Sequence, residues 1–278
     1  MRHTRNALRI AASVLAVAGM AGPAFPVFGA PPPTTSAAPP PLKQVISVPV
    51  PASRLPPPVN PTNKPKSTAP SPAPLVFAKQ KGCIQSSVGA VQLKNMPWPQ
   101  QTLQIAKAHQ FATGAGQTVA VIDTGVHRHS QFQNRLVGGG DYVLPGGNGL
   151  EDCDGHGTEV AGIIGAKTAP DTGFDGMAPG ADIVSIRQTS ANYMTENKGP
   201  NGQGQRAGTL GTLAKAVMWA ANFAKAPNGK PVSVINISLA ACHTVSEGLD
   251  PSYRALQAAI HYAVHRRNIV VVAAAGNL

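Results

Sequence analysis

The chain has 278 residues, enough for one large α/β domain or two small ones, and a formal net charge of +11 at pH 7. The charge is unevenly distributed: 11 Lys and Arg but no Asp or Glu precede residue 123, whereas 12 basic and 12 acidic residues follow from there on. The globular part is therefore neutral, which argues against a basic recognition face and against nucleic-acid binding.

The N-terminal 30 residues have the pattern of an export signal. Arg2, Arg5 and Arg9 form a positive region, and residues 8–21 are an apolar run of signal-peptide length that is followed by small residues. We expect residues 1–30 to be a signal peptide. An uncleaved membrane anchor is the alternative, and either one implies an exported protein.

The next segment, residues 31–75, is rich in proline. It holds 16 of the 27 prolines and few large apolar side chains, so it cannot offset the entropy lost on ordering. We expect an extended linker over residues 31–75. An N-terminal extension with a lead-in helix should follow over residues 76–116, and the globular domain should occupy residues 117–278.

Within that domain, apolar runs predict buried strands, and longer segments between them predict helices. This alternation is typical of a doubly wound parallel α/β sheet with helices on both faces, whose active sites lie outside the carboxyl ends of the strands. The polar stretch 192–208 is expected to be a surface insertion. The expected strands are Thr118–Asp123, Asp182–Arg187, 232–238 and 269–275, and the expected helices are 156–166, 210–224 and 253–266.

Three cysteines are present: Cys83, Cys153 and Cys242. In an exported chain this odd number indicates one disulfide and one cysteine without a partner in this sequence. We prefer the pair Cys83 and Cys153, which would tie the segment before the first strand to the loop before His156. Three unpaired cysteines are the alternative. The sequence has no cysteine or histidine cluster with metal-ligand spacing and no phosphate-binding glycine loop, so neither a metal nor a cofactor is expected.

Three polar residues lie at the ends of predicted elements. Asp123 closes the first strand, His156 lies between two glycines at a helix start, and Asn277 follows the last strand, where its amide could stabilise an oxyanion. Asp154 is a candidate cap for the helix. Taken singly, each residue has a simpler explanation as a turn former or a polar helix end.

Together, in the order Asp, His, Asn, these motifs resemble those of the subtilisin family of serine proteases over most of the chain from residue 118 to 277. The resemblance implies a subtilisin-like peptidase domain over residues 117–278, acting on a protein or peptide substrate. It implies that Asp123 orients the imidazole, that His156 is general base and then general acid, and that Asn277 is an oxyanion donor.

The same resemblance implies Ser238, Leu239 and Ala240 as substrate-binding residues, because segment 236–239 is similar to the family's strand that lines the substrate cleft. Where the family commonly has glycines after the Ser-Leu pair, this chain has Ala240 and Ala241, which leaves the shape of the specificity pocket open. The family's Gly-Thr-Ser segment with the nucleophilic serine is absent from the 278 residues. We therefore expect a fragment that lacks its nucleophile and is inactive by itself.

Within the family, the chain most resembles the mycosins, membrane-anchored proteases of type VII secretion systems. The resembling features are the export signal, Trp98 and Gln100 ahead of a short helix, segment 114–117 before the first strand and segment 186–188 after the second. The resemblance implies a protease that processes substrates of, or stabilises, a type VII secretion membrane complex. It implies an exported, membrane-associated or extracellular protein, with a C-terminal anchor outside this sequence. A non-catalytic structural component of such a complex is the alternative.

Overall fold

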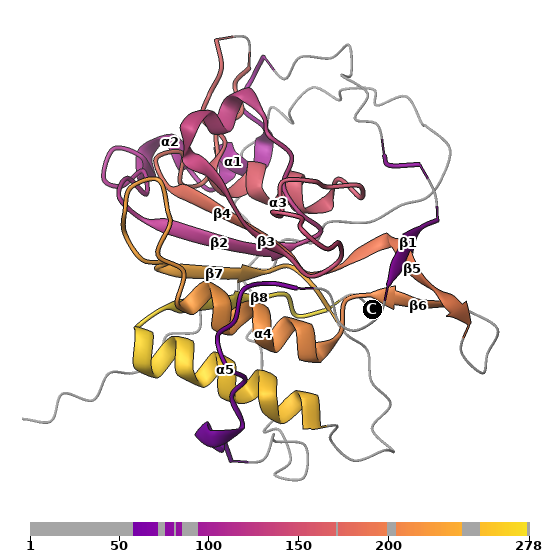
Figure 1. Ribbon diagram of the computed structural model, residues 1–278. Helices are drawn as coiled ribbons and strands as arrows, with labels where there is room; N and C mark the ends of the chain where they lie inside the picture. The colour runs from indigo at the N-terminus through magenta and orange to yellow at the C-terminus, as the bar shows by residue number, and fades with distance from the viewer. Residues whose placement is uncertain are drawn as a thin grey trace, which may run out of the picture. The chain divides into compact units, whose positions relative to one another are not determined.

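The computed structural model describes residues 58–71, 76–80, 82–84, 94–170, 172–198, 204–240 and 251–276 (Figure 1). A five-stranded sheet has the strand order β3-β4-β2-β7-β8, and every neighbouring pair in it is parallel. The predicted α/β class with a parallel sheet is confirmed. The strands are β2 (Thr118–Asp123), β3 (Leu136–Asp141), β4 (Asp182–Arg187), β7 (Val234–Ile237) and β8 (Val270–Ala273).

Helices cover both faces of this sheet, as the apolar sequence of β2 requires. Val119 and Val121 point to one face and pack in the same cluster as Ala161 of α3, whereas Ala120 and Ile122 point to the face covered by α4 and α5. Figure 1 shows α3 on one side of the sheet and α4 and α5 on the other. A strand that is apolar at consecutive positions needs cover on both faces, and here it has that cover. The helices are α3 (His156–Gly165), α4 (Leu210–Ala221) and α5 (Pro251–Arg267).

Most predicted boundaries differ from the observed ones by a few residues at the ends. β2 and β4 have the predicted bounds, while β7 and β8 are shorter than segments 232–238 and 269–275. The edge strand β3 was not predicted, because three of its six residues are glycines and leave no alternating side-chain pattern. It becomes a strand because the edge of β4 offers backbone partners, with a register shift between Gly138 and Gly140.

The polar stretch 192–208 lies between β4 and α4 as predicted, but it has regular structure. It forms most of an antiparallel sheet in the order β1-β5-β6, in which β1 comes from the N-terminal extension. Phe77 and Tyr193 are buried there, in one cluster with Cys153. Pairing between segments so distant in sequence cannot be inferred from polar composition. The strands are β1 (Phe77–Lys79), β5 (Ser190–Lys198) and β6 (Gly204–Ala207).

The segment predicted as a linker is described over residues 58–71. It contains a short 3-10 helix, η2 (Pro61–Asn63), and the Asn60 side chain before it accepts a hydrogen bond from the Thr62 N–H at 3.0 Å. Lys64 places its Nζ 5.5 Å from the ring centroid of Tyr262 on α5, a distance suited to a cation–π contact. This part of the segment therefore lies against the globular domain.

Two short helices, α1 (Trp98–Thr102) and α2 (Ile105–Ala108), precede β2 and form the expected lead-in. His109 follows α2 and pairs with Asp175 at 3.4 Å, which joins the lead-in to the loop after α3. Within the described ranges, no helix combines the length and the apolar character needed to cross a membrane.

Candidate active site

Asp123 is the last residue of β2, the central strand of the parallel sheet. Its side chain is fully buried, and Oδ1 accepts a hydrogen bond from the backbone N–H of Thr124 at 2.8 Å. The neighbours β4 and β7 enclose this strand end on both sides. The fold therefore holds a carboxylate at the edge of the sheet where active sites of this class form.

His156 is the first residue of α3, which packs directly on the end of β2. The close approach depends on Gly157, because a Cβ at this position would lie 2.1 Å from the carbonyl oxygen of Gly125 and 3.1 Å from the Cβ of Asp123. Only glycine permits backbone segments to come this near. The glycine beside His156 thus brings the helix start next to Asp123.

The two side chains meet in a hydrogen bond: Nδ1 of His156 lies 2.7 Å from Oδ1 of Asp123. The carboxylate is fully buried, whereas 40% of the imidazole is exposed. With Nδ1–H donating to the carboxylate, the Nε2 lone pair is directed away from Asp123 and can accept a proton. Chemically, this is an oriented base at the carboxyl edge of the parallel sheet.

The environment raises the pKa of His156 above its ordinary value of 6.5. The main cause is the hydrogen bond from the ring to Asp123, which stabilises the charged imidazolium. Partial burial acts in the opposite direction, and the charges of Asp123, Glu159 and Asp152 add smaller contributions that raise the pKa. The imidazole is therefore a stronger base than a free one.

A second buried carboxylate, that of Asp152, holds the backbone around His156. It accepts hydrogen bonds from the backbone N–H groups of Gly155 and Thr158, both at 2.8 Å, and from the hydroxyls of Thr158 and Thr124. The candidate cap Asp154 was the wrong choice, because its carboxylate bonds β5 whereas that of Asp152 bonds the N–H groups at the start of α3. Asp152 lies four residues before His156 and Asp154 two residues before it, and the sequence alone did not show which of them holds the helix start.

Asp154 instead joins the loop to β5. Its carboxylate accepts from the Ser190 hydroxyl at 2.5 Å, from the Ala191 N–H at 2.9 Å and from the Asn192 side-chain amide at 3.1 Å. Asp152 thus bonds the loop before His156 to the start of α3, and Asp154 bonds the same loop to the antiparallel sheet.

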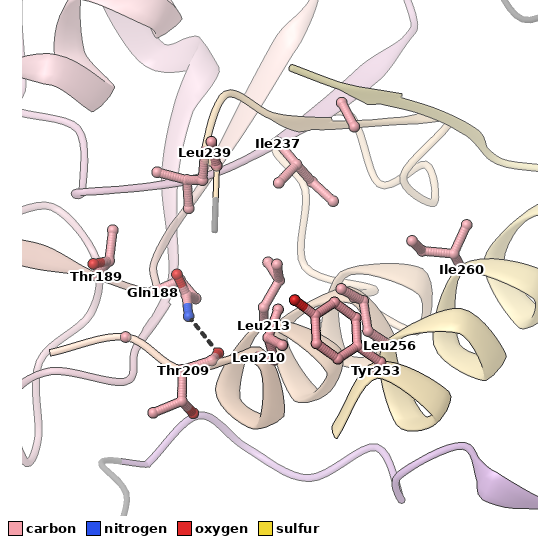
Figure 2. Close-up of a pocket in the computed structure, with 13 residues that line it drawn as sticks. Gln188, Thr189, Thr209, Leu210, Leu213, Ile237, Leu239, Tyr253, Leu256 and Ile260 are labelled. Atoms are coloured by element: carbon pink, nitrogen blue, oxygen red, sulfur yellow. Dashed lines mark hydrogen bonds between the residues drawn. The ribbon is translucent and has the colours of Figure 1, made fainter. Parts of the chain in front are cut away.

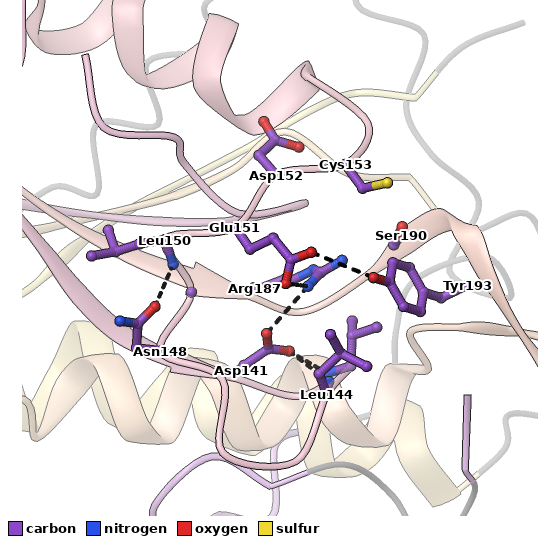
Figure 3. A network of polar contacts seen from close by, with 12 residues as sticks. Asp141, Leu144, Asn148, Leu150, Glu151, Asp152, Cys153, Arg187, Ser190 and Tyr193 are labelled. Carbon is purple, nitrogen blue, oxygen red and sulfur yellow. Dashed lines mark hydrogen bonds and ion pairs between the residues drawn. The ribbon is translucent and has the colours of Figure 1, made fainter. Parts of the chain in front are cut away.

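The buried end of β4 supports the same loop through Arg187 (Figure 3). Arg187 is fully buried, and its Nη1 lies 3.4 Å from Oδ2 of Asp141 and 3.3 Å from Oε2 of Glu151. Its guanidinium carbon lies 4.7 Å from the ring centroid of Tyr193. Among the described residues, Nε and Nη2 of Arg187 have no hydrogen-bond partner. This ionic cluster was not predicted, since its members are dispersed in the sequence.

Cys83 and Cys153 form a disulfide, the pair preferred from the sequence. Two hydrogen bonds to the Cys153 carbonyl accompany it, from the Ile84 N–H at 3.0 Å and from the Asn192 side-chain amide at 3.2 Å. The N-terminal extension is thereby attached next to Asp152. Cys242 lies outside the described residues.

The predicted substrate-binding residues lie after β7. Leu239 and Ala240 line a cavity of about 340 Å³ between the ends of β7 and β8 and the helices α4 and α5 (Figure 2). Ser238 does not line it and instead accepts a hydrogen bond from the Asn236 amide at 3.0 Å. Neither Asp123 nor His156 contributes to the lining. The cavity is mostly apolar, with Gln188 at its edge bonded to the Thr209 carbonyl at 3.0 Å.

Asn277, the predicted oxyanion donor, lies outside the described residues. The strand before it, β8, is parallel to β7 and therefore ends at the same edge as β2. In the part of the chain that the structure describes, no group of three or more His, Cys, Asp or Glu is placed to hold a metal ion.

Comparison with known proteins finds similar sequences and similar structures. Mycosin-1 of Mycobacterium tuberculosis is 47% identical over 185 residues, which are 65% of this chain and 39% of mycosin-1. A crystal structure of MycP1 from the ESX-1 type VII secretion system has a TM-score of 0.69 and 39% identity, over 80% of this chain and 56% of that chain. A chain in a structure of an intact ESX-5 inner membrane complex has a TM-score of 0.68 and 34% identity, over 80% of this chain and 52% of that chain.

The predicted similarity to mycosins is thus confirmed, and the chain spans 39% to 56% of the lengths of these three relatives. The family model for subtilases, peptidase S8, matches residues 114–278, more than half of the sequence. This chain belongs to the subtilase family.

Proposed function

We propose that the full-length protein is a serine endopeptidase of the mycosin type, in which Asp123 and His156 supply two members of an Asp-His-Ser triad. The observation that carries the proposal is the 2.7 Å hydrogen bond from His156 to the buried carboxylate of Asp123. A buried carboxylate that orients a partly exposed imidazole is the arrangement that serine proteases use to activate a hydroxyl.

The reaction follows from these roles. Nε2 of His156 takes the proton of a serine hydroxyl while the serine oxygen attacks the peptide carbonyl carbon, and Asp123 stabilises the imidazolium that forms. The side-chain amide of Asn277 donates to the oxyanion. His156 then protonates the leaving amine as the C–N bond breaks, and a water molecule repeats the sequence to release the acyl group. Ser238, Leu239 and Ala240 contact the substrate chain.

The proposal concerns a full-length protein, since the matched relatives extend well beyond this sequence. Among the described residues, no hydroxyl is hydrogen-bonded to Nε2 of His156. We therefore expect no peptide turnover from residues 1–278 alone. The proposed setting is an exported protein at the cell membrane or outside the cell, in contact with a type VII secretion complex and its protein substrates.

A second function, as a structural component of such a complex, is favoured by the match to a chain of the ESX-5 inner membrane complex. In this role the folded domain, and not peptide hydrolysis, would be required. The two roles are compatible within one protein.

Hydrolysis of a peptide panel by the full-length protein tests the first proposal. His156→Ala should lower kcat by roughly 10²-fold or more, since it removes the general base. His265→Ala, the same substitution at an exposed residue of α5, is the control and should retain activity. Retained turnover in His156→Ala would contradict the proposal. A host with a type VII secretion system tests the structural role. Secretion that is normal with His156→Ala but lost when the whole protein is deleted would support this role. Normal secretion after the deletion would contradict it.

A further inference from the structure

The carboxylate of Asp152 is buried, with 1% of the residue exposed, and is held by hydrogen bonds. Within the described residues, it has no cationic partner in an ion pair. Its five donors are Thr124 Oγ1, the backbone N–H groups of Asp154, Gly155 and Thr158, and Thr158 Oγ1. A buried carboxylate needs such donors, and here they tie it to the backbone of three residues around His156.

Some of these bonds hold the start of α3. The N–H groups of Gly155 and Thr158 belong to the helix end, where backbone donors have no partner within the helix. A carboxylate there satisfies the donors and interacts favourably with the helix dipole. Since His156 lies between these two residues, Asp152 holds the backbone on both sides of it.

The remaining bond extends to Asp123 through Thr124. The Thr124 hydroxyl donates to Oδ1 of Asp152 at 2.8 Å and accepts from the Gly157 N–H at 2.9 Å. The backbone N–H of the same threonine donates to Oδ1 of Asp123 at 2.8 Å, the oxygen that His156 also contacts. Thr124 therefore connects Asp152 to both members of the pair, because its hydroxyl bonds Asp152 and the residue after His156 while its backbone N–H bonds Asp123.

We propose that Asp152 is a positioning residue for the Asp123–His156 pair and that it acts through the Thr124 hydroxyl. Its effect on catalysis rests on the function proposed above, whereas its effect on the geometry of the pair does not. Asp152 touches no substrate in this role. It holds the backbone on both sides of His156, so that the imidazole stays within hydrogen-bond distance of the Asp123 carboxylate.

A purely electrostatic role makes a different prediction. The charged groups that influence the imidazole of His156 are Asp123, Glu159 and Asp152, and all three favour its protonated form. Removing the Asp152 charge would lower the pKa of His156 even if positioning were unimportant. Thr124→Val separates the two roles, because it cuts the connection and changes no charge.

The test uses ¹⁵N-histidine-labelled chain and follows the Nδ1–H resonance and the pKa of His156 by NMR. In Thr124→Val and in Asp152→Asn we expect the Nδ1–H resonance to be lost or broadened and the pKa to fall toward about 6.5. Thr124→Ser keeps the hydroxyl and should restore both values. Asp182→Asn, the same charge change at a buried carboxylate that begins β4 and accepts from the Asn228 N–H at 2.8 Å, should leave both as in the unmodified chain, and circular dichroism checks folding.

The proposal would be overturned if Thr124→Val leaves the Nδ1–H resonance and the pKa of His156 unchanged while Asp152→Asn lowers that pKa. This result would mean that Asp152 acts on His156 only through its charge. The proposal would also be overturned if both variants leave the resonance and the pKa unchanged. In the full-length protein, Thr124→Val should lower kcat on the order of 10²-fold with KM unchanged, since a small misplacement of the base has this cost. If the full-length protein shows no turnover at all, the proposed function fails while the NMR result still decides the positioning role.

Discussion

Gly157 at the start of α3 lies against the carbonyl oxygen of Gly125, so closely that a Cβ on Gly157 would be 2.1 Å from that oxygen. The contact sets the distance between the helix that begins with His156 and the strand that ends with Asp123. It is a contact between two backbones, and a side chain on Gly157 would change the separation of the pair.

Gly157→Ala should therefore destabilise the fold and separate His156 from Asp123. We expect a loss of roughly 1–3 kcal/mol in the free energy of unfolding, as for other overpacked sites. Gly162→Ala is a matched control on the same helix, where a Cβ meets no atom within 4 Å. It should stabilise the protein by about 0.5–1 kcal/mol through helix propensity. Urea unfolding measures the free energy of unfolding of both variants. Equal changes in the two variants would contradict the conclusion that the Gly157–Gly125 contact sets the separation of the helix and the strand.

The raised pKa of His156 predicts how stability depends on pH. Because the folded-state pKa exceeds the unfolded value of about 6.5, protonation favours the folded state. The contribution is fully present below about pH 6.5 and is lost as the pH rises through the raised pKa. The difference in unfolding free energy between the unmodified chain and His156→Gln should thus be largest at low pH. A difference that grows with pH would show that the pKa is lowered.

The same shift predicts the activity profile of the full-length protein. Since the neutral imidazole is the base, kcat/KM should rise with pH through an apparent pKa above 6.5. Asp123→Asn removes the carboxylate that raises the pKa, so the acid limb should move to lower pH. It should also lower kcat by roughly 10⁴-fold, the effect of losing this carboxylate in other triad enzymes. An acid limb that stays in place would exclude His156 as the titrating group.

The disulfide between Cys83 and Cys153 closes a loop with a sequence separation of 70 residues. Replacing both cysteines by serine should lower the free energy of unfolding by roughly 2–5 kcal/mol, because the unfolded chain gains conformational freedom. Cys242→Ser serves as the control and should have little effect. A comparable loss from Cys242→Ser, or peptide mapping that finds Cys242 joined to Cys83 or Cys153, would contradict this pairing.

Arg187 should be among the most sensitive positions in the sheet. Arg187→Met leaves the buried carboxylate of Asp141 without its cation, which should cost about 3–5 kcal/mol. Glu151→Gln should cost less, since 49% of this side chain is exposed to solvent. Arg206→Met on β6, at an exposed arginine, is the matched control. Thermal unfolding ranks the variants, and an Arg187→Met protein as stable as the control would mean that the cluster adds nothing.

The sequence by itself determined the central strand and the residues at its functional end. An apolar run that is buried on both faces has a strong local signal, so β2 and β4 were predicted with their observed bounds. His156 could also be assigned to a helix start, since the flanking glycines and the small residues after it are a local pattern. These features depend on neighbours in the chain, and local sequence therefore specifies them.

Only the tertiary structure decided what holds the site together. β3 has no side-chain pattern and exists because β4 pairs with it, and β1 joins β5 across more than a hundred residues of sequence. Asp152 and Asp154 are the same residue type two positions apart, yet Asp152 bonds the helix start and Asp154 bonds β5. The difference lies in which backbone N–H groups each carboxylate meets after folding. Such partners come together only when distant segments pack, so no local pattern in the sequence records them.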